Sequence, residues 1–244
     1  MLKTSVVLLG LCLALGTPVM AGAAFQTDTI STSAGNVQIT FIGHATLVME
    51  WGGKVIHVDP VGQYADYSQM PKADLVLITH EHGDHMDAKA LAAIRTDKTI
   101  VVTTETCASQ LGDGTVMANG GTKNVLGIDI EAVPAYNLVH KRDNGAPYHP
   151  KGRGNGYILT IGGTVLYIAG DTENTPEMKA LSGIDIAFLP MNLPFTMTPE
   201  MVADAAKAFK PKVLYPYHFG ETDTSKIVAL LKDTGIEVRI RSMK

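Results

Sequence analysis

Residues 79–85, with the sequence Thr-His-Glu-His-Gly-Asp-His, constrain this chain more than any other feature. They follow the continuous apolar run at 75–78, which is typical of a strand that is buried on both faces. Four potential metal ligands therefore lie within six residues at the end of a buried strand: His80, His82, Asp84 and His85. Histidine nitrogens and carboxylate oxygens are ligands that zinc accepts. A metal site explains this motif better than the structural alternative, a solvated histidine-rich loop.

Two further candidate ligands follow apolar strands in the second half of the chain. Asp171 lies in the segment Ala-Gly-Asp-Thr, where it would bridge two ions, although an aspartate of this kind also commonly forms a turn. His218 lies among aromatic residues, where a packed histidine is the structural alternative. Ligands at the ends of successive strands converge at one edge of a sheet. We therefore expect a site for two ions, with Asp84 and His85 facing the second.

The hydrophobic pattern predicts an α/β fold with two mixed sheets and helices on the outside, in one domain over residues 24–244. Two hairpins, at 47–58 and 157–168, have matching layouts and each ends in an acidic turn. Residues 25–36 are polar and are expected to be irregular. Strands are expected at 37–41, 47–51, 55–58, 75–78, 100–103, 128–133, 157–161, 165–168, 184–189, 213–215 and 237–240. Helices are expected at 88–95, 176–181, 199–209 and 225–232.

Residues 1–23 are typical of a secretory signal peptide, with cleavage near 21–24. Lys3 precedes an apolar run at 5–16, which is too short to span a bilayer comfortably; an uncleaved anchor is the alternative. We expect the mature domain to be exported to the periplasm, or secreted, with no membrane segment after cleavage. It would keep one cysteine, Cys107, which excludes an intramolecular disulfide.

The order of the motifs resembles the metallo-β-lactamase superfamily. The H-x-H-x-D-H motif at 80–85, the Gly-Asp-Thr at 170–172 and the late His218 carry this resemblance, which extends from about residue 37 to the C-terminus. Shorter segments at 41–45, 134–137, 149–152 and 216–218 are similar to a lactonase-like branch of metal-dependent hydrolases. The resemblance implies an αββα four-layer sandwich with two divalent metal ions at one edge. Zinc is the expected metal, with manganese or iron as alternatives.

One ligand departs from the pattern of the family. Related sequences often carry a histidine directly after the Pro-Ala motif, where this chain has Tyr136 and Asn137. His149 takes that place in the expected set because its His-Pro-Lys-Gly segment also occurs in closer relatives, and His140 is the runner-up. The expected metal ligands are His80, His82, Asp84, His85, His149, Asp171 and His218.

Two ions held in this way imply hydrolysis by a metal-bound hydroxide. Asp84 is the expected catalytic residue, since in its protonated form it would supply a proton to the leaving group, with a metal-bound water as the alternative donor. Asp59 would orient a ligand histidine. The expected substrate-binding residues are His44, Tyr136 and Lys151, each with an ordinary alternative as a turn histidine, a packed tyrosine and a solvated lysine.

The expected substrate is an ester, a lactone or a related small molecule. The alternatives are a phosphodiesterase or nuclease, and a non-catalytic metal-binding protein on the same fold, which the missing histidine at Asn137 favours. The chain has 20 Lys and Arg against 24 Asp and Glu, with a formal charge of −4, so no basic footprint indicates a nucleic-acid partner.

Overall fold

The computed structural model describes residues 25–243, and these residues form two sheets of seven strands each. The expected signal peptide, residues 1–23, lies outside the described residues. Within residues 25–243, every helix is too short or too polar to cross a membrane.

The first sheet contains β1 to β7 in the order of the sequence. Its first four strands form an antiparallel meander, and its last four are paired in parallel, with β4 shared by both parts. The strands are β1 (Gln26–Thr32), β2 (Gly35–Gly43), β3 (Thr46–Trp51), β4 (Lys54–Val58), β5 (Leu75–Leu77), β6 (Ile100–Thr103) and β7 (Thr115–Val116).

The second sheet repeats this plan with β8 to β14. Its strands β8 to β11 are antiparallel, and β11 to β14 are parallel. The strands are β8 (Thr122–Val125), β9 (Ile128–Ala135), β10 (Gly154–Ile161), β11 (Thr164–Ile168), β12 (Ile186–Pro190), β13 (Val213–Tyr217) and β14 (Glu237–Val238). The two expected hairpins are β3–β4 and β10–β11, and they occupy the same place in the two sheets.

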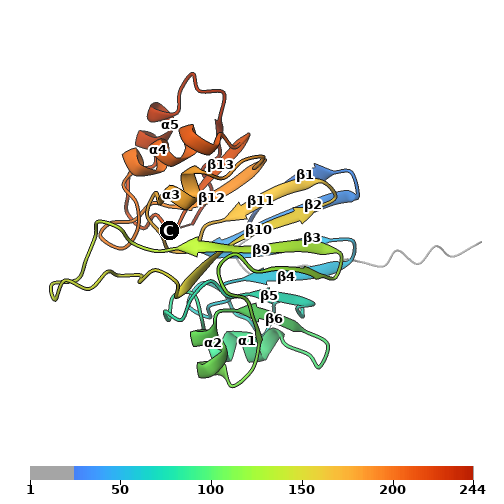
Figure 1. Cartoon of the computed structure of the whole chain (residues 1–244). Helices are drawn as coiled ribbons and strands as arrows, with labels where there is room; N and C mark the ends of the chain where they lie inside the picture. The colour runs from blue at the N-terminus through green and yellow to red at the C-terminus, as the bar shows by residue number, and fades with distance from the viewer. Residues whose placement is uncertain (1–24, 244) are drawn as a thin grey trace, which may run out of the picture.

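The helices form the two outer layers of the molecule. In Figure 1, α1 and α2 lie together on one side of the paired sheets, and α3, α4 and α5 lie on the other. This arrangement confirms the predicted αββα sandwich of two mixed sheets. The helices are α1 (Ala88–Ile94), α2 (Glu105–Leu111), α3 (Pro176–Lys179), α4 (Pro199–Phe209) and α5 (Ser225–Leu230).

Alternating side chains divide the core into two parts. On β5, Leu75 and Leu77 pack between the sheets, whereas Val76 packs under α1, so the strand is buried on both faces as predicted. Between the sheets, the ring of Phe41 lies 5.1 Å from that of Tyr215 on β13. Each such buried apolar side chain stabilises the fold by about 1.5–3 kcal/mol. The strand ends are thereby fixed on a rigid scaffold.

The helix α4 shows how local sequence signals fix an element that covers the second sheet. The Thr198 side chain accepts a hydrogen bond from the Met201 N–H at 3.2 Å, and Pro199 occupies the first turn. The helix ends at Lys210, which has a left-handed backbone with φ of 51°. The predicted range of 199–209 is confirmed.

Four elements were not expected from the sequence. Residues 25–36 are not irregular, because β1 pairs along its whole length with β2 from Gln26↔Phe41 to Thr32↔Gly35. As a half-exposed edge strand it has a polar composition, which hid it from the hydrophobic pattern. The helix α2 is seven residues long and buries only Cys107, although Thr104 caps its start and Gly112 its end. The short strands β7 and β8 lie at the sheet edges.

Candidate metal centre

The loop that follows β5 carries the histidine-rich motif at the edge of the first sheet. Its start is held by Thr79, whose N–H and hydroxyl both donate to the Asp59 carboxylate, at 2.8 and 2.7 Å. The loop then forms a single turn in which the N–H of His85 donates to the His82 carbonyl at 3.0 Å. Asp87 caps α1 directly afterwards. The motif is thus fixed at both ends.

Eight side chains from both sheets converge at this edge. They form three groups in which the potential ligand atoms all lie within 4.8 Å of one another. The groups are His80, His82 and His149; His44, Asp84, His85 and His218; and His80, His85 and Asp171. The structure therefore brings together all seven of the expected metal ligands, and it adds His44.

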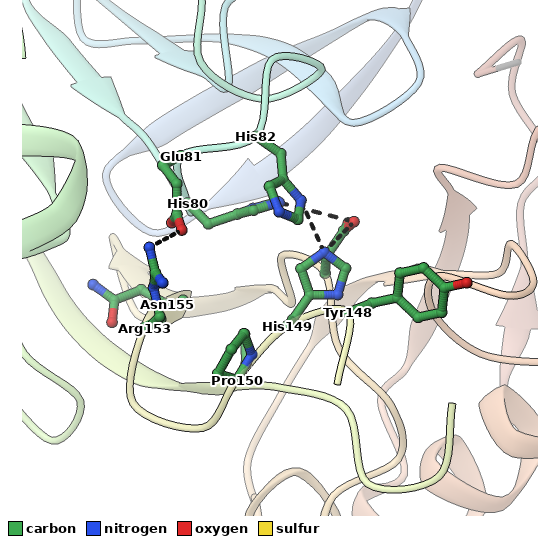
Figure 2. Close-up of a pocket in the computed structure, with 11 residues that line it drawn as sticks. His80, Glu81, His82, Tyr148, His149, Pro150, Arg153 and Asn155 are labelled. Atoms are coloured by element: carbon green, nitrogen blue, oxygen red, sulfur yellow. Dashed lines mark hydrogen bonds and ion pairs between the residues drawn. The ribbon is translucent and has the colours of Figure 1, made fainter. Parts of the chain in front are cut away.

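Asp171 lies between the two histidine groups. Its Oδ2 is 3.3 Å from His149 Nε2 on one side and 3.3 Å from His218 Nε2 on the other. Its Oδ1 is 3.3 Å from His85 Nε2. Figure 2 shows a pocket lined by His80, His82 and His149, in which the rings of His82 and His149 lie close together, with a distance of 3.2 Å between His82 Nδ1 and His149 Nε2.

Several polar atoms of the cluster are buried without a hydrogen bond. They include the Nε2 atoms of His80, His85 and His218, together with Asp171 Oδ1. An unsatisfied buried polar group is costly, and such groups are rare in proteins. Here they converge, and imidazole nitrogen with carboxylate oxygen is a donor set for divalent transition metals. The cluster is able to bind metal.

The ionisable groups of the cluster strongly perturb one another. Burial lowers the pKa of His80 well below its usual value, and the charge of His85 adds to this effect. Burial also opposes the charged form of His218, but the nearby Asp171 outweighs it and raises the pKa to about 9. Burial would raise the pKa of Asp171, yet His218 and His85 hold it well below its usual range. Cation binding therefore competes with protons shared between these groups.

Asp59 supports the cluster from beneath. It is fully buried, and its Oδ2 lies 2.8 Å from His85 Nδ1, so the opposite ring nitrogen, Nε2, points at Asp171. This bond confirms the expectation that Asp59 orients a candidate ligand. Burial opposes the charged form of His85, but the carboxylates of Asp171 and Asp59 raise its pKa well above the usual value.

Three residues of the site have a strained backbone. Among the described residues, six that are not glycine have a positive φ, and they include His44 at 54°, Asp59 at 45° and His218 at 47°. The backbone N–H of His218 donates to the His44 carbonyl at 2.8 Å, which links the second sheet to the first. Strained residues of this kind are typical of functional sites.

His149 and His140 have different surroundings. The side chain of Asn137 accepts from the His149 N–H at 2.8 Å and contacts His149 Nδ1 at 2.7 Å, which orients the ring toward His82 and Asp171. His140 points instead to Glu173, with a distance of 2.7 Å between its Nδ1 and the carboxylate. The structure thus places His149 in the cluster and His140 outside it.

Of the three expected substrate-binding residues, one lies in the cluster and two lie outside it. His44 lies in the cluster, with Nε2 at 3.1 Å from Asp84 Oδ2. Tyr136 and Lys151 do not reach the cavity beside the cluster, because both point to Glu177, at 2.8 and 2.6 Å. Their pairing with Glu177 could not be read from the sequence.

A cavity of about 320 Å³ opens beside the cluster. Besides the candidate ligands, it is lined by four side chains that sequence reasoning did not single out: Arg142, Tyr148, Asn192 and Phe195. All four come from the loops after β9 and β12, and no sequence motif marked them. The volume lies within the range of small-molecule sites.

Comparison with known proteins identifies the family. Residues 38–218 match the family model for a β-lactamase superfamily domain. The chain belongs to the metallo-β-lactamase superfamily. A UPF0173 metal-dependent hydrolase from Pelotomaculum thermopropionicum is 32% identical over 222 residues, which cover 84% of this chain and 97% of the relative. This superfamily member is thus similar along most of its length to metal-dependent hydrolases.

Solved structures with a similar fold agree with this placement. A protein from Parabacteroides distasonis, named as a metal-dependent hydrolase, is 51% identical, with a TM-score of 0.87, over 90% of this chain and 100% of that chain. Igni18, a metallo hydrolase from Ignicoccus hospitalis, is 26% identical with a TM-score of 0.70, over 85% and 96%. The diiron β-hydroxylase CmlA from Streptomyces venezuelae is 19% identical with a TM-score of 0.66, over 85% of this chain and 52% of that chain, and it shares the fold alone.

Proposed function

We propose that this metal-dependent hydrolase binds two divalent cations, zinc in the first place, and hydrolyses an ester, a lactone or a related small molecule. The position of Asp171 carries the proposal, because its carboxylate is shared by two separate groups of histidines. One group would be held by His80, His82 and His149, and the other by Asp84, His85 and His218.

The cations would lower the pKa of a coordinated water and polarise the scissile carbonyl. The chain's own residues hold and orient the reacting groups. Asp171 joins the two halves of the centre, and Asp59 and Asn137 fix the rings of His85 and His149. Asn192 also lines the cavity, and its side-chain amide would be a neutral hydrogen-bond donor there for the oxygen that becomes negative.

We assign the proton transfer to Asp84. Its side chain is 43% exposed, whereas that of Asp171 is 3% exposed, so Asp84 is the carboxylate within reach of a substrate. Its Oδ2 lies 3.1 Å from His44 Nε2 and 3.6 Å from His218 Nε2. Burial would raise the pKa of Asp84, but hydrogen bonds with His218 and His44 lower it. Asp84 is therefore a carboxylate at rest, which would accept a proton from the attacking water and then deliver it to the leaving group, while His44 holds the same carboxylate oxygen.

Export is part of the proposal. The leader at 1–23 would direct the chain to the periplasm, where the soluble domain acts without a membrane segment. The negative formal charge of −4 supports a small-molecule substrate over a nucleic acid.

Metal analysis and a substrate panel test the proposal together. The purified protein is assayed for metals, stripped with a chelator and reloaded with zinc, manganese or iron. Turnover is then measured with an aryl ester, a γ-lactone and a bis-aryl phosphodiester. We expect two ions per chain and metal-dependent turnover of the ester or the lactone. A fully loaded protein that turns over none of them would indicate the non-catalytic alternative, and a preference for the phosphodiester would favour the phosphodiesterase.

A further inference from the structure

We propose that the substrate of this site carries an anionic group, which Arg142 binds, and an apolar part that packs on Tyr148 and Phe195. This inference rests on the proposed function, because it names the class of ester or lactone that the site would hydrolyse.

Arg142 differs from the other arginines of the chain. The chain has five, and the other four each form an ion pair with a carboxylate. Those pairs are Arg95–Asp113, Arg153–Glu81, Arg239–Glu237 and Arg241–Asp28. Within residues 25–243, no carboxylate lies at ion-pair distance from Arg142. Its guanidinium is thus a cation without an internal anion.

The guanidinium is nevertheless held in place. Its carbon lies 5.0 Å from the centroid of the Tyr148 ring, and Nη2 donates to the Tyr148 carbonyl at 3.4 Å. The backbone around it closes a turn, with the Arg142 N–H donating to the Ala146 carbonyl at 2.8 Å. A guanidinium that stacks on an aromatic ring keeps its remaining N–H donors free for a planar carboxylate.

Arg142 lines the same cavity as the candidate metal centre. The lining of the cavity includes Arg142 as well as His82, Asp84 and His218. A molecule that fills about 320 Å³ would therefore meet both the cluster and Arg142. Bound cations would polarise the scissile carbonyl, so Arg142 would remain available for a second, separate group of the substrate.

An apolar surface lies next to this cation. The rings of Tyr148 and Phe195 meet edge to face at 5.2 Å, and Phe195 is 42% exposed where it lines the cavity. Leu193, in the same loop, is 46% exposed. Exposed apolar side chains at a cavity rim are typical of ligand sites. The cavity therefore offers one cation beside an aromatic wall.

The loop that carries Arg142 is anchored by a buried carboxylate. Glu173 is fully buried and accepts from the N–H groups of Leu138, Val139 and His140, each at 2.7 Å. The side chain of Asn137 also donates to the Phe195 carbonyl at 2.9 Å, which ties the two rim loops together. Arg142 thus extends from a preorganised base, and preorganisation favours binding.

A matched pair of esters tests this inference. Mono-4-nitrophenyl adipate and 4-nitrophenyl hexanoate have acyl chains of equal carbon count, and only the adipate ester ends in a carboxylate. We expect kcat/KM of the metal-loaded protein to favour the adipate ester. Arg142→Gln should reduce kcat/KM for the adipate ester by about 5- to 20-fold and change it for the hexanoate ester less than about twofold.

Lys141→Gln is the matched control, since it removes one positive charge from the same loop at a residue that does not line the cavity. We expect it to leave the ratio of the two esters unchanged, and Arg142→Lys to give an intermediate ratio. Calorimetry gives a second readout, because the product adipate should bind the wild type more tightly than hexanoate does, and Arg142→Gln should abolish this difference.

The outcomes separate the inference from the proposed function. Turnover of the hexanoate ester with no adipate preference, or equal effects of Arg142→Gln on both esters, overturns the role of Arg142 and leaves the hydrolase intact. No turnover of either ester by the loaded protein overturns ester hydrolysis itself. If Lys141→Gln and Arg142→Gln lost the adipate preference equally, the preference would come from the general charge of the loop. That result would overturn the specific role of Arg142.

Discussion

The two halves of the molecule have the same strand order, but they supply different parts of the candidate site. In each sheet a hairpin leads into a parallel strand pair, and an aspartate follows the second strand of that hairpin. Asp59 comes directly after β4, whereas Asp171 comes three residues after β11. Val58 and Ile168 are each the last residue paired with the next parallel strand, so Asp171 lies further past the edge of its sheet.

This difference in position gives the two carboxylates different roles. Asp59 stays in the buried layer and accepts bonds from Thr79 and His85. Asp171 reaches the histidine rings, and its Oδ1 has no hydrogen bond. An acidic residue at a strand end can therefore support the site or form part of it, depending on how far past the strand it lies.

The connections before these hairpins differ as well. Only residues 44–45 join β2 to β3, and they place His44 at the cluster. The equivalent connection between β9 and β10 covers residues 136–153, and it carries His149 and Arg142. The short connection of the first half thus adds only His44 to the site, whereas the long connection of the second half adds part of the cavity wall.

Replacing Asp171 should have the largest effect. We expect Asp171→Asn to abolish hydrolysis, by more than about 100-fold, and to lower metal content at the same time. Changes to groups that only orient ligands already cost about 10- to 100-fold, and Asp171 contacts both histidine groups directly. Metal analysis and turnover of an aryl ester measure both effects. Full metal content in this variant would contradict the shared position of Asp171.

Replacing the two histidines of the connection at 136–153 should have different effects on metal content. We expect His149→Ala to lose about one ion per chain, because His149 Nε2 lies 3.3 Å from Asp171. His140→Ala is its control and should keep both ions, since its ring contacts Glu173 instead. Metal stoichiometry after dialysis distinguishes them, and the reverse result would exchange the roles of the two residues.

Asp59→Asn should lower the metal affinity of the centre without abolishing metal binding. The amide cannot provide the carboxylate that holds His85 Nδ1 at 2.8 Å, so metal affinity should fall about 10- to 100-fold. Competition with a chelator measures this change. If Asp59→Asn lost as much activity as Asp171→Asn, the distinction between the supporting and the shared carboxylate would fail.

Glu173→Gln should lower stability in a pH-dependent way. The carboxylate is fully buried with several N–H donors, so we expect a loss of about 1.5–3 kcal/mol in unfolding free energy at neutral pH. Burial would raise the pKa of Glu173, but the N–H donors lower it below the usual 4.5. Its contribution is therefore complete above pH 4.5 and is lost as the pH falls through the lowered value. Urea unfolding of both proteins from pH 7 to pH 3 should show the difference shrinking only at the acidic end.

Lys151→Ala should have the smallest effect. Lys151 lies on the long connection, but it is 60% exposed and pairs with Glu177 outside the cavity. We expect kcat/KM to change less than about twofold and the urea midpoint to fall slightly. A large rise in KM would restore the role in substrate binding that the sequence predicted for this residue.

The sequence predicted most of the fold because its buried strands have clear patterns. The run that became β5 is apolar on both faces, and α4 carries its cap and its first-turn proline. The strand β1 was not predicted, because an edge strand that is exposed on one face needs no apolar run.

The candidate site was predictable where its residues follow strands in a motif, and the structure brings those residues together. The sequence could not separate His149 from His140, because the decision depends on Asn137 and Glu173, which come from different segments. The role of Arg142 in lining the cavity depends on how its loop folds back, and no local pattern records that.

The contact between His218 and His44 also bears on how the centre is made. Synthesis adds His44 long before His218, yet the backbone of one is hydrogen-bonded to the other. The full cluster therefore forms only after His218 has been produced and both sheets have closed. We expect ions to enter after folding, so the compartment in which the chain folds would decide which metal the protein acquires.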